Sequence, residues 1–307
     1  MPSRIPATLV VIVAVAAAAC GPRADRAHAA AARPPAPSVE TIPLRYDRHL
    51  PSLPVRIDGE LDARFAFDTG IGINLVSRRL CKMLSCVSAG EYVGKRMSGQ
   101  EITVPLAKLG LLAVGHEEQR DVVVGVLDLD DFVEASDVQG FVSLGFFQRR
   151  AFTLDEKRGE LVLEDAESLA RRVAGGAAVP VEVRREGEAV TVFLPLEVGG
   201  HRALAEVDTG SDALILDERF LAELGIDRSA AKVVEGRDET GHAFTRWFAE
   251  VSADVHPAGA PAIRQAGMRT MFQKIIHDGL VGRRFLEPWA VTFDLPRQRM
   301  VFGRSAR

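Results

Sequence analysis

The chain has 307 residues, of which 47% are hydrophobic and 26% are charged, and its formal net charge is −4. This composition is that of a globular protein with enough apolar side chains to build a core. The lack of a basic excess argues against a nucleic-acid-binding protein.

The N-terminus predicts export. Arg4 precedes an apolar stretch, residues 7–19, that is short for a membrane span and ends in small residues, which predicts a signal peptide over residues 1–20. Residues 17–21 resemble a bacterial lipobox, in which Cys20 becomes the lipidated first residue of the mature protein. The alternative is ordinary cleavage after Ala29, which would release a soluble protein. Either route places the chain in the bacterial cell envelope, lipid-anchored or periplasmic.

Residues 21–42 are rich in Ala, Pro and Arg and have no apolar periodicity, which predicts a flexible tether. After the tether, the triplet Asp68-Thr69-Gly70 stands between two apolar runs. The triplet recurs 140 residues later as Asp208-Thr209-Gly210, again between apolar runs. Two triplets in matching context are much harder to attribute to chance than one.

Other landmarks recur at nearly the same spacing, as expected of a duplicated unit. Ser77 and Asp217 are both good helix N-caps and each begins a segment with a short helical pattern. The remaining paired landmarks are two glycine-rich hairpin tips, residues 94–99 and 236–241, two apolar segments, residues 140–143 and 279–282, and two closing strands, residues 161–163 and 300–302.

These repeats predict two copies of one unit, residues 43–164 and residues 179–303, joined by a connector over residues 165–178. Each copy has the size of a domain. Within each, short apolar runs separated by Gly, Pro, Asp and Asn favour strands and hairpins plus one short helix. The predicted fold class is mainly β.

Cys81 and Cys86 follow the first predicted helix cap. Five residues apart in one continuous helix, their Cα atoms would be too far apart for a relaxed disulfide. The second copy has Gly225 opposite Ser85, which predicts that the helix ends near Ser85 and folds Cys86 back. A local disulfide and two buried thiols both remain possible.

The two aspartates predict a catalytic pair. Two adjacent carboxylates that share one proton can act as base and acid, because like charges in contact cannot both ionise. In each triplet the glycine allows a tight loop, and the hydroxyl of Thr69 or Thr209 can bond across to the opposite loop. Such a site must lie where the two copies meet.

At this point the sequence resembles the aspartic peptidase clan, and specifically the bacterial retropepsin-like aspartyl proteases. The resemblance rests on both triplets with their apolar flanks and on the segments at residues 140–143 and 279–282, and it covers both copies. It implies two pseudo-symmetric retropepsin-like β-barrel lobes with a cleft between them. It also implies an aspartic-type endopeptidase, a hydrolase with Asp68 and Asp208 as its catalytic residues.

In retropepsins each subunit contributes one flap, so the resemblance implies two flaps closing over a peptide substrate in this chain. The residues expected to form the flaps and bind substrate are Gly94, Met97, Gly99, Gly236 and Gly241. The alternative is that both tips are simple surface hairpins.

Two positions depart from the family pattern. Ile71 follows the first triplet, whereas Ser211 follows the second and is expected to bond to Asp208, which would make Asp208 the more ionised partner. Ser143 replaces the glycine found at Gly282. These departures leave open a second hypothesis, a catalytically weak or inactive relative that binds peptides in the same cleft, and a third, a structural β-protein whose triplets merely close turns.

No cofactor or metal is expected, because the seven histidines lack zinc-type spacing and the glycine pairs fit no phosphate-binding pattern. The expected partners are a peptide or protein substrate and, through the lipid anchor, the membrane. The chain is expected to be a monomer with an intramolecular pseudo-dimer.

Overall fold

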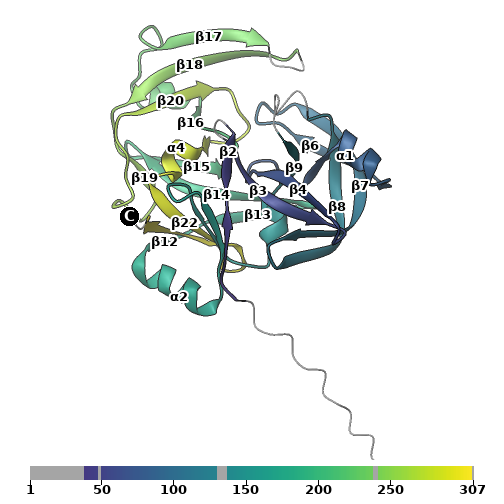
Figure 1. Ribbon diagram of the computed structural model, residues 1–307. Coiled ribbons are helices and arrows are strands. Elements are labelled where there is room, and N and C mark those ends of the chain that lie inside the picture. Colours follow the sequence, from purple (N-terminus) through teal and green to yellow (C-terminus); the bar gives the residue numbers. More distant parts are fainter. Residues whose placement is uncertain (1–37, 48–49, 130–136, 238–240, 306–307) are drawn as a thin grey trace, which may run out of the picture. The chain divides into compact units, whose positions relative to one another are not determined.

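Strands dominate the part of the chain that the structure describes (Figure 1). The computed structural model describes residues 38–47, 50–129, 137–237 and 241–305. The predicted mainly β fold class is confirmed. The predicted signal peptide of residues 1–20, with Cys20, and most of the predicted tether lie outside the described residues. No helix in the described ranges is long and apolar enough to span a lipid bilayer.

The first large sheet has eight strands among the described residues, in the order β2-β3-β4-β9-β5-β8-β7-β6. Their bounds are β2 Arg45–Asp47, β3 Leu50–Ile57, β4 Leu61–Phe67, β5 Leu75–Ser77, β6 Val87–Lys95, β7 Glu101–Val114, β8 Glu117–Leu127 and β9 Val138–Val142. In β3, Leu53, Val55 and Ile57 are buried while Pro54 and Arg56 are exposed. This alternation is that of a strand with one face in the core.

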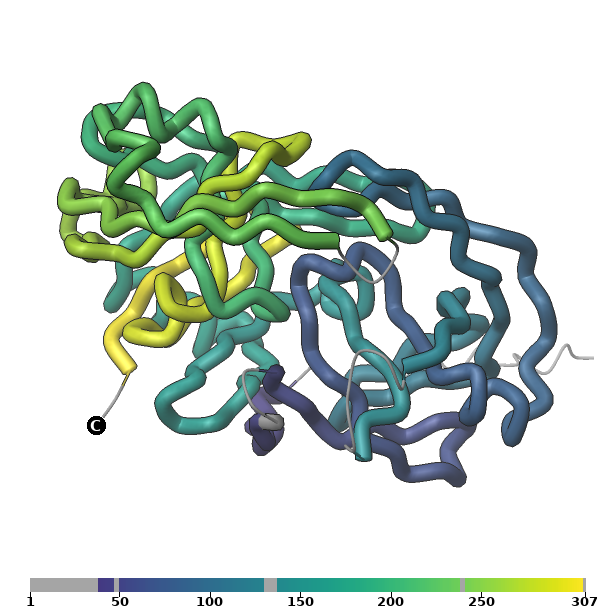
Figure 2. The backbone as a smooth tube through the Cα atoms, turned by 90° about the horizontal axis from the view of Figure 1, so that it is seen from above, coloured from purple at the N-terminus to yellow at the C-terminus, as the bar shows by residue number. Residues whose placement is uncertain are grey.

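The second large sheet has nine strands within the described ranges, in the order β13-β14-β15-β21-β16-β20-β18-β17, with β19 paired to β14. Their bounds are β13 Glu182–Glu186, β14 Ala189–Val198, β15 His201–Val207, β16 Leu214–Asp217, β17 Lys232–Arg237, β18 Ala243–Val251, β19 Val255–Pro257, β20 Met268–Gln273 and β21 Gly279–Val281. Figure 2 shows this sheet in teal to yellow and the first in purple to blue.

The two large sheets share their strand order and strand directions. In the first, β9 lies between β4, to which it is parallel, and β5, to which it is antiparallel. In the second, β21 lies in the same way between β15 and β16. Strand β5 is parallel to β8, and β16 is parallel to β20.

A third sheet has six strands among the described residues, in the order β1-β11-β10-β22-β23-β12. Their bounds are β1 Glu40–Pro43, β10 Phe152–Asp155, β11 Glu160–Leu163, β12 Ala177–Pro180, β22 Trp289–Asp294 and β23 Arg299–Arg304. Strands β10 and β22 pair at its centre, where the rings of Phe152 and Phe293 stack with centroids 4.8 Å apart. The hydroxyls of Thr153 and Thr292 lie 2.8 Å apart in the same pairing. This sheet therefore contains β11 and β23, which hold the two closing strands predicted at residues 161–163 and 300–302.

The helices are short. Their bounds in the described residues are α1 Arg78–Met83, η1 Leu144–Phe147, α2 Ala166–Gly175, α3 Phe220–Glu223, α4 Arg283–Leu286 and η2 Leu295–Arg297. Ser77 caps α1 as predicted, because its side chain accepts the N–H of Leu80 at 3.0 Å. The predicted cap at Asp217 is wrong, since Asp217 ends β16 and α3 begins after Arg219 with no side-chain cap. Helix α2, capped by Asp165, occupies the predicted connector.

Both glycine-rich segments lie at hairpins. Between β6 and β7 the N–H of Gly99, at φ +85°, donates to the carbonyl of Arg96 at 2.8 Å. Strands β17 and β18 pair antiparallel up to Arg237 and Ala243, and residues 238–240 of this tip lie outside the described residues.

Candidate functional site

The two Asp-Thr-Gly triplets lie in loops that follow equivalent strands. Asp68 follows β4 and donates its backbone N–H to the carbonyl of Val142 on β9, at 3.0 Å. Asp208 follows β15 and donates its N–H to the carbonyl of Val281 on β21, also at 3.0 Å. Strands β9 and β21 hold the apolar segments predicted at residues 140–143 and 279–282, so each of these segments anchors one aspartate loop.

The two threonines lock the loops together. The backbone N–H of Thr69 donates to the hydroxyl of Thr209 at 3.1 Å, and the N–H of Thr209 donates to the hydroxyl of Thr69 at 3.0 Å. Each hydroxyl then donates across to the other strand, Thr69 to the carbonyl of Val207 at 2.7 Å and Thr209 to that of Phe67 at 3.4 Å. Both side chains are fully buried. The cross-loop bonding expected of these threonines is present.

The two glycines let the loops approach. A Cβ atom at Gly70 would lie 2.5 Å from Cγ of Asp208, and one at Gly210 would collide with the carboxylate of Asp68. Each carboxylate therefore stands over the glycine of the opposite loop. Each also accepts the N–H of the glycine in its own loop, at 2.8 Å.

The structure brings the two carboxyl groups into hydrogen-bond contact. Burial, then the charges of Asp68 and Glu206, and then a hydrogen bond with Asp68 raise the pKa of Asp208 well above its ordinary value. This direction runs against the expectation that Asp208 is the more ionised partner, which stays a prediction. Its Oδ1 accepts the backbone N–H of Ser211 at 3.2 Å, too weak a contact to offset burial. The pair can hold one proton between two oxygens and offer a hydrogen-bond donor and an acceptor side by side.

Ser143 is accommodated by Asn74. Its backbone N–H donates to Asn74 Oδ1 at 2.9 Å, and its hydroxyl lies 3.3 Å from the same oxygen. In the second copy the N–H of Gly282 donates instead to the backbone carbonyl of Ala213 at 3.1 Å, and a Cβ at Gly282 would lie 2.5 Å from that oxygen. The first loop thus uses an amide side chain where the second uses a close backbone contact.

A groove of about 520 Å³ lies beside the first triplet loop and is lined in part by Gly70. Its lining residues are Gly70, Ile71, Gly72, Tyr92, Val93, Gly94, Lys95, Met97, Ile102, Arg184, Glu186, Ala189, Thr191, Phe193, Glu206, Ile276 and His277. Two of the predicted flap residues, Gly94 and Met97, are among them. Gly99 lies next to the groove, because a Cβ there would lie 2.9 Å from Ile276.

The second hairpin is placed differently. Gly236 and Gly241 are not among the groove-lining residues within the described ranges. Gly236 lies against the ring of Phe244 on the neighbouring strand, and all residues of β17 are exposed. Within the described residues, the hairpin between β6 and β7 borders the groove and the hairpin between β17 and β18 does not.

The sequence motifs did not identify the charged residues on one wall of the groove. Glu206 precedes Asp208 by two residues, its side chain is 14% exposed, and its Oε2 lies 3.6 Å from Nε2 of His277. Burial, followed by the charge of Asp68, raises the pKa of Glu206 to about 7. Burial and the charge of Arg184 lower the pKa of His277. No sequence motif marked Glu206. The residue 140 positions earlier, which the repeat spacing makes its equivalent, is Ala66.

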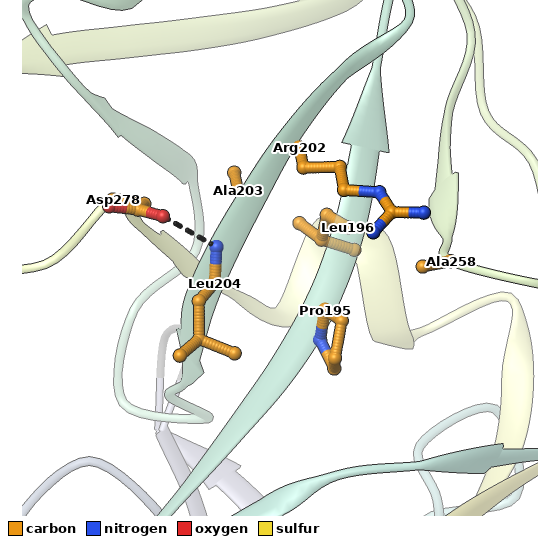
Figure 3. Close-up of a pocket in the computed structure, with 7 residues that line it drawn as sticks. All are labelled: Pro195, Leu196, Arg202, Ala203, Leu204, Ala258 and Asp278. Carbon is orange, nitrogen blue, oxygen red and sulfur yellow. Dashed lines mark hydrogen bonds between the residues drawn. The ribbon is translucent and has the colours of Figure 1, made fainter.

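A second, smaller recess of about 280 Å³ lies on β14 and β15 (Figure 3). Arg202 and Asp278 are its charged lining residues, and Asp278 accepts the backbone N–H of Leu204 at 2.9 Å. Asp278 also pairs with Arg219 at 2.9 Å. None of the predicted site residues lines this recess.

Cys81 and Cys86 are free thiols, not a disulfide. The N–H of Cys86 donates to the carbonyl of Cys81 at 3.0 Å, and Ser85 between them has φ +51°. The chain therefore folds Cys86 back beside Cys81, as predicted. Burial and a hydrogen bond with Cys81 raise the pKa of the Cys86 thiol to about 12. Among the described residues no group of His, Cys, Asp and Glu side chains is arranged to hold a metal ion.

No family model and no curated protein matches this sequence. Solved structures do match its fold. Conglutin gamma, a basic 7S globulin from lupine seeds, has a TM-score of 0.52 at 13% identity over 88% of this chain and 96% of that one. Basic 7S globulin from soybean has a TM-score of 0.53 at 12% identity, covering 87% and 95%. The structure of edgp has a TM-score of 0.54 at 10% identity, covering 88% and 95%.

These comparisons overturn the resemblance to bacterial retropepsin-like aspartyl proteases, because the similar structures are basic 7S globulins and edgp. The predicted activity is wrong on the same ground. The assignment of aspartic endopeptidase, protease and hydrolase to Asp68 and Asp208 came from the paired triplets and from that resemblance. At such low identity the likeness concerns the fold alone.

Proposed function

We propose that this chain is a non-catalytic binding protein that holds an extended segment of a peptide or protein in the groove beside Gly70. In this proposal residues 43–164 and 179–303 are two pseudo-symmetric copies of one β unit, and the groove lies between them. The shared strand order of the two large sheets supports this division. The N-terminal prediction of export assigns the binding to the cell envelope.

The observation that carries the proposal is the way β6 borders the groove. Four consecutive β6 residues, from Tyr92 to Lys95, are groove-lining. Successive residues of a strand point to opposite faces, so a groove that meets four in a row meets the edge of the strand. Among the described strands β6 pairs only with β7, so its other edge carries N–H and C=O groups without a strand partner. Such an edge can add a peptide as a further strand.

The wall opposite β6 is formed by the faces of strands β13 and β14 rather than by a strand edge. The lining residues there alternate, with Arg184 and Glu186 on β13 and Ala189, Thr191 and Phe193 on β14. A peptide paired to β6 would therefore direct every second side chain towards β13, β14 and β15. Main-chain bonds to β6 would provide affinity, and the facing side chains would provide selectivity.

The test is binding of a pool of acetylated and amidated peptides to the full chain, with the recovered peptides identified by mass spectrometry. A selected peptide is then methylated at alternate backbone nitrogens in two registers. Added-strand binding predicts that one register abolishes binding and the other does not, because alternate N–H groups point towards β6. Equal tolerance of both registers would contradict the added strand.

Substitutions that block the groove test whether the peptide binds there. Thr191→Trp places a large ring on the wall and is expected to prevent binding. Val233→Trp, on the exposed β17 of the other hairpin, is the matched control and is expected to bind normally. Equal effects of both variants, or no peptide captured by the unaltered chain, would refute the proposed function.

A further inference from the structure

Glu206 lies on the groove face of β15, in a row of side chains that crosses the sheet. Phe193 on β14 is its register partner, and Glu182 on β13 is the partner of Phe193. Residues opposed in this way lie on the same face of a sheet and are close enough to interact. His277 completes the group, because its ring meets that of Phe193 edge to face, with centroids 4.8 Å apart.

The guanidinium of Arg184 shows that a cation can occupy this face. It lies 4.0 Å above the ring of Phe193, and its Nε donates to Glu182 at 2.6 Å. A cation over an aromatic face is stabilised by the ring quadrupole. Arg184 is thus engaged with Glu182 and Phe193.

Among the charges near Glu206, that of Arg184 favours its ionised form and that of Asp68 opposes it. The titratable and charged groups around it are His277 after β20, Glu182, Arg184 and Glu186 on β13, Lys95 on β6, and Asp68 and Asp208 in the triplet loops. Burial and the charge of Arg184 lower the pKa of His277, whose Nε2 lies 3.6 Å from Glu206. The charge of Asp68 acts against ionisation of Glu206. The groove wall here favours a positive group from outside.

We infer that Glu206, Phe193 and His277 form a subsite for a basic side chain, lysine or arginine, of the peptide held in the groove. This inference rests on the proposed binding function. A strand added to β6 directs alternate side chains to this wall, where Glu206 receives the charged end beside His277. The equivalent residue of the other copy, Ala66, is fully buried, so the subsite belongs to one side of the groove.

The subsite is expected to depend on pH. Burial and Asp68 raise the pKa of Glu206 to about 7, so its carboxyl is neutral in acid and charged above neutrality. Preference for a basic side chain therefore appears as the pH rises through about 7.

The experiment uses a captured peptide, fluorescently labelled and resynthesised with lysine, arginine, norleucine or citrulline at each position in turn. At about pH 8.5, lysine or arginine at one position is expected to bind roughly tenfold more tightly than its neutral analogue, a ratio that disappears at about pH 5.5. The ratio is expected to fall to one in Glu206→Gln and to persist in Glu60→Gln, a control at an exposed turn outside the groove. Thermal unfolding confirms that both variants are folded.

If peptides bind but no position prefers a basic residue, the subsite is refuted while the proposed function stands. Persistence of the preference in Glu206→Gln, or its loss in Glu60→Gln alone, also refutes the assignment to Glu206. Failure of every peptide to bind refutes the proposed function and the subsite with it.

Discussion

Thr69 and Thr209 each donate a backbone N–H to the hydroxyl of the other, at 3.1 and 3.0 Å, in a fully buried contact between the two triplet loops. Each hydroxyl also donates to a strand carbonyl of the opposite copy. The contact therefore satisfies two N–H groups and two carbonyls that no water reaches. It fixes the distance between Asp68 and Asp208.

Replacing either hydroxyl is expected to destabilise the protein. Thr69→Val or Thr209→Val leaves a buried N–H and a buried carbonyl without a partner, at a cost of about 2–4 kcal/mol. Urea unfolding measures the loss, and Thr103→Val on the exposed face of β7 is the control. The double variant should lose less than the sum of the single losses, because the two residues share their bonds. Additive losses would show that the threonines act independently.

The triplet glycines are expected to tolerate no side chain. Gly70→Ala places a Cβ against Cγ of Asp208 and should cost about 1–3 kcal/mol while separating the carboxyl groups. Gly175→Ala, at the end of α2 with no atom within 4 Å of its Cβ, is the control and should be neutral or slightly stabilising. A neutral Gly70→Ala would contradict the close approach of the loops.

Glu206 is expected to make stability depend on pH. Its pKa rises from the ordinary value of 4.5 in the unfolded chain to about 7 in the folded one, so the folded state resists its ionisation. The cost is absent below about pH 4.5, grows as the pH rises and is complete above about 7, where it reaches up to about 3 kcal/mol.

Glu206→Gln should therefore be more stable than the unaltered chain at about pH 8.5 and equally stable at about pH 4. Urea unfolding across this range measures the difference, with Glu60→Gln at an exposed turn as control. A constant difference at all pH values would show that Glu206 does not titrate in this window.

The charge of Asp68 is expected to hold a proton on Asp208. After burial, that charge is the largest cause raising the pKa of Asp208. Asp68→Asn should therefore lower the pKa of Asp208, although burial keeps it above the ordinary value of 3.8. Carboxyl carbon chemical shifts measured by NMR against pH provide the value. An unchanged pKa would place the two carboxyl groups out of contact.

Local chemistry explains which elements were predictable. Ser77 caps α1 because its side chain needs only the N–H three residues ahead. Asp217 has the same local signal, but β16 continues through it by pairing with β20 up to Gln273, so tertiary pairing overrides the cap. Its carboxylate accepts the N–H of Arg219 and that of Ile275 instead.

The duplication was visible because both copies retain their turn glycines and buried runs, and the two sheets share one strand order. The sequence did not show where equivalent residues of the two segments lie in the fold. The hairpin between β6 and β7 borders the groove, whereas Gly236 and Gly241 do not, since each is placed by contacts distant in sequence. The retropepsin-like interpretation, which expected two equivalent flaps and endopeptidase activity, is wrong.

The sequence by itself determined the mainly β class, because periodicity and turn glycines are local patterns, and its paired triplets predicted that Asp68 meets Asp208. Only the tertiary structure decided the ionisation and surroundings of these groups. The raised pKa values of Asp208 and Glu206 follow from burial and from charges that the fold brings close. Such quantities depend on distances between atoms far apart in the chain, which linear order does not contain.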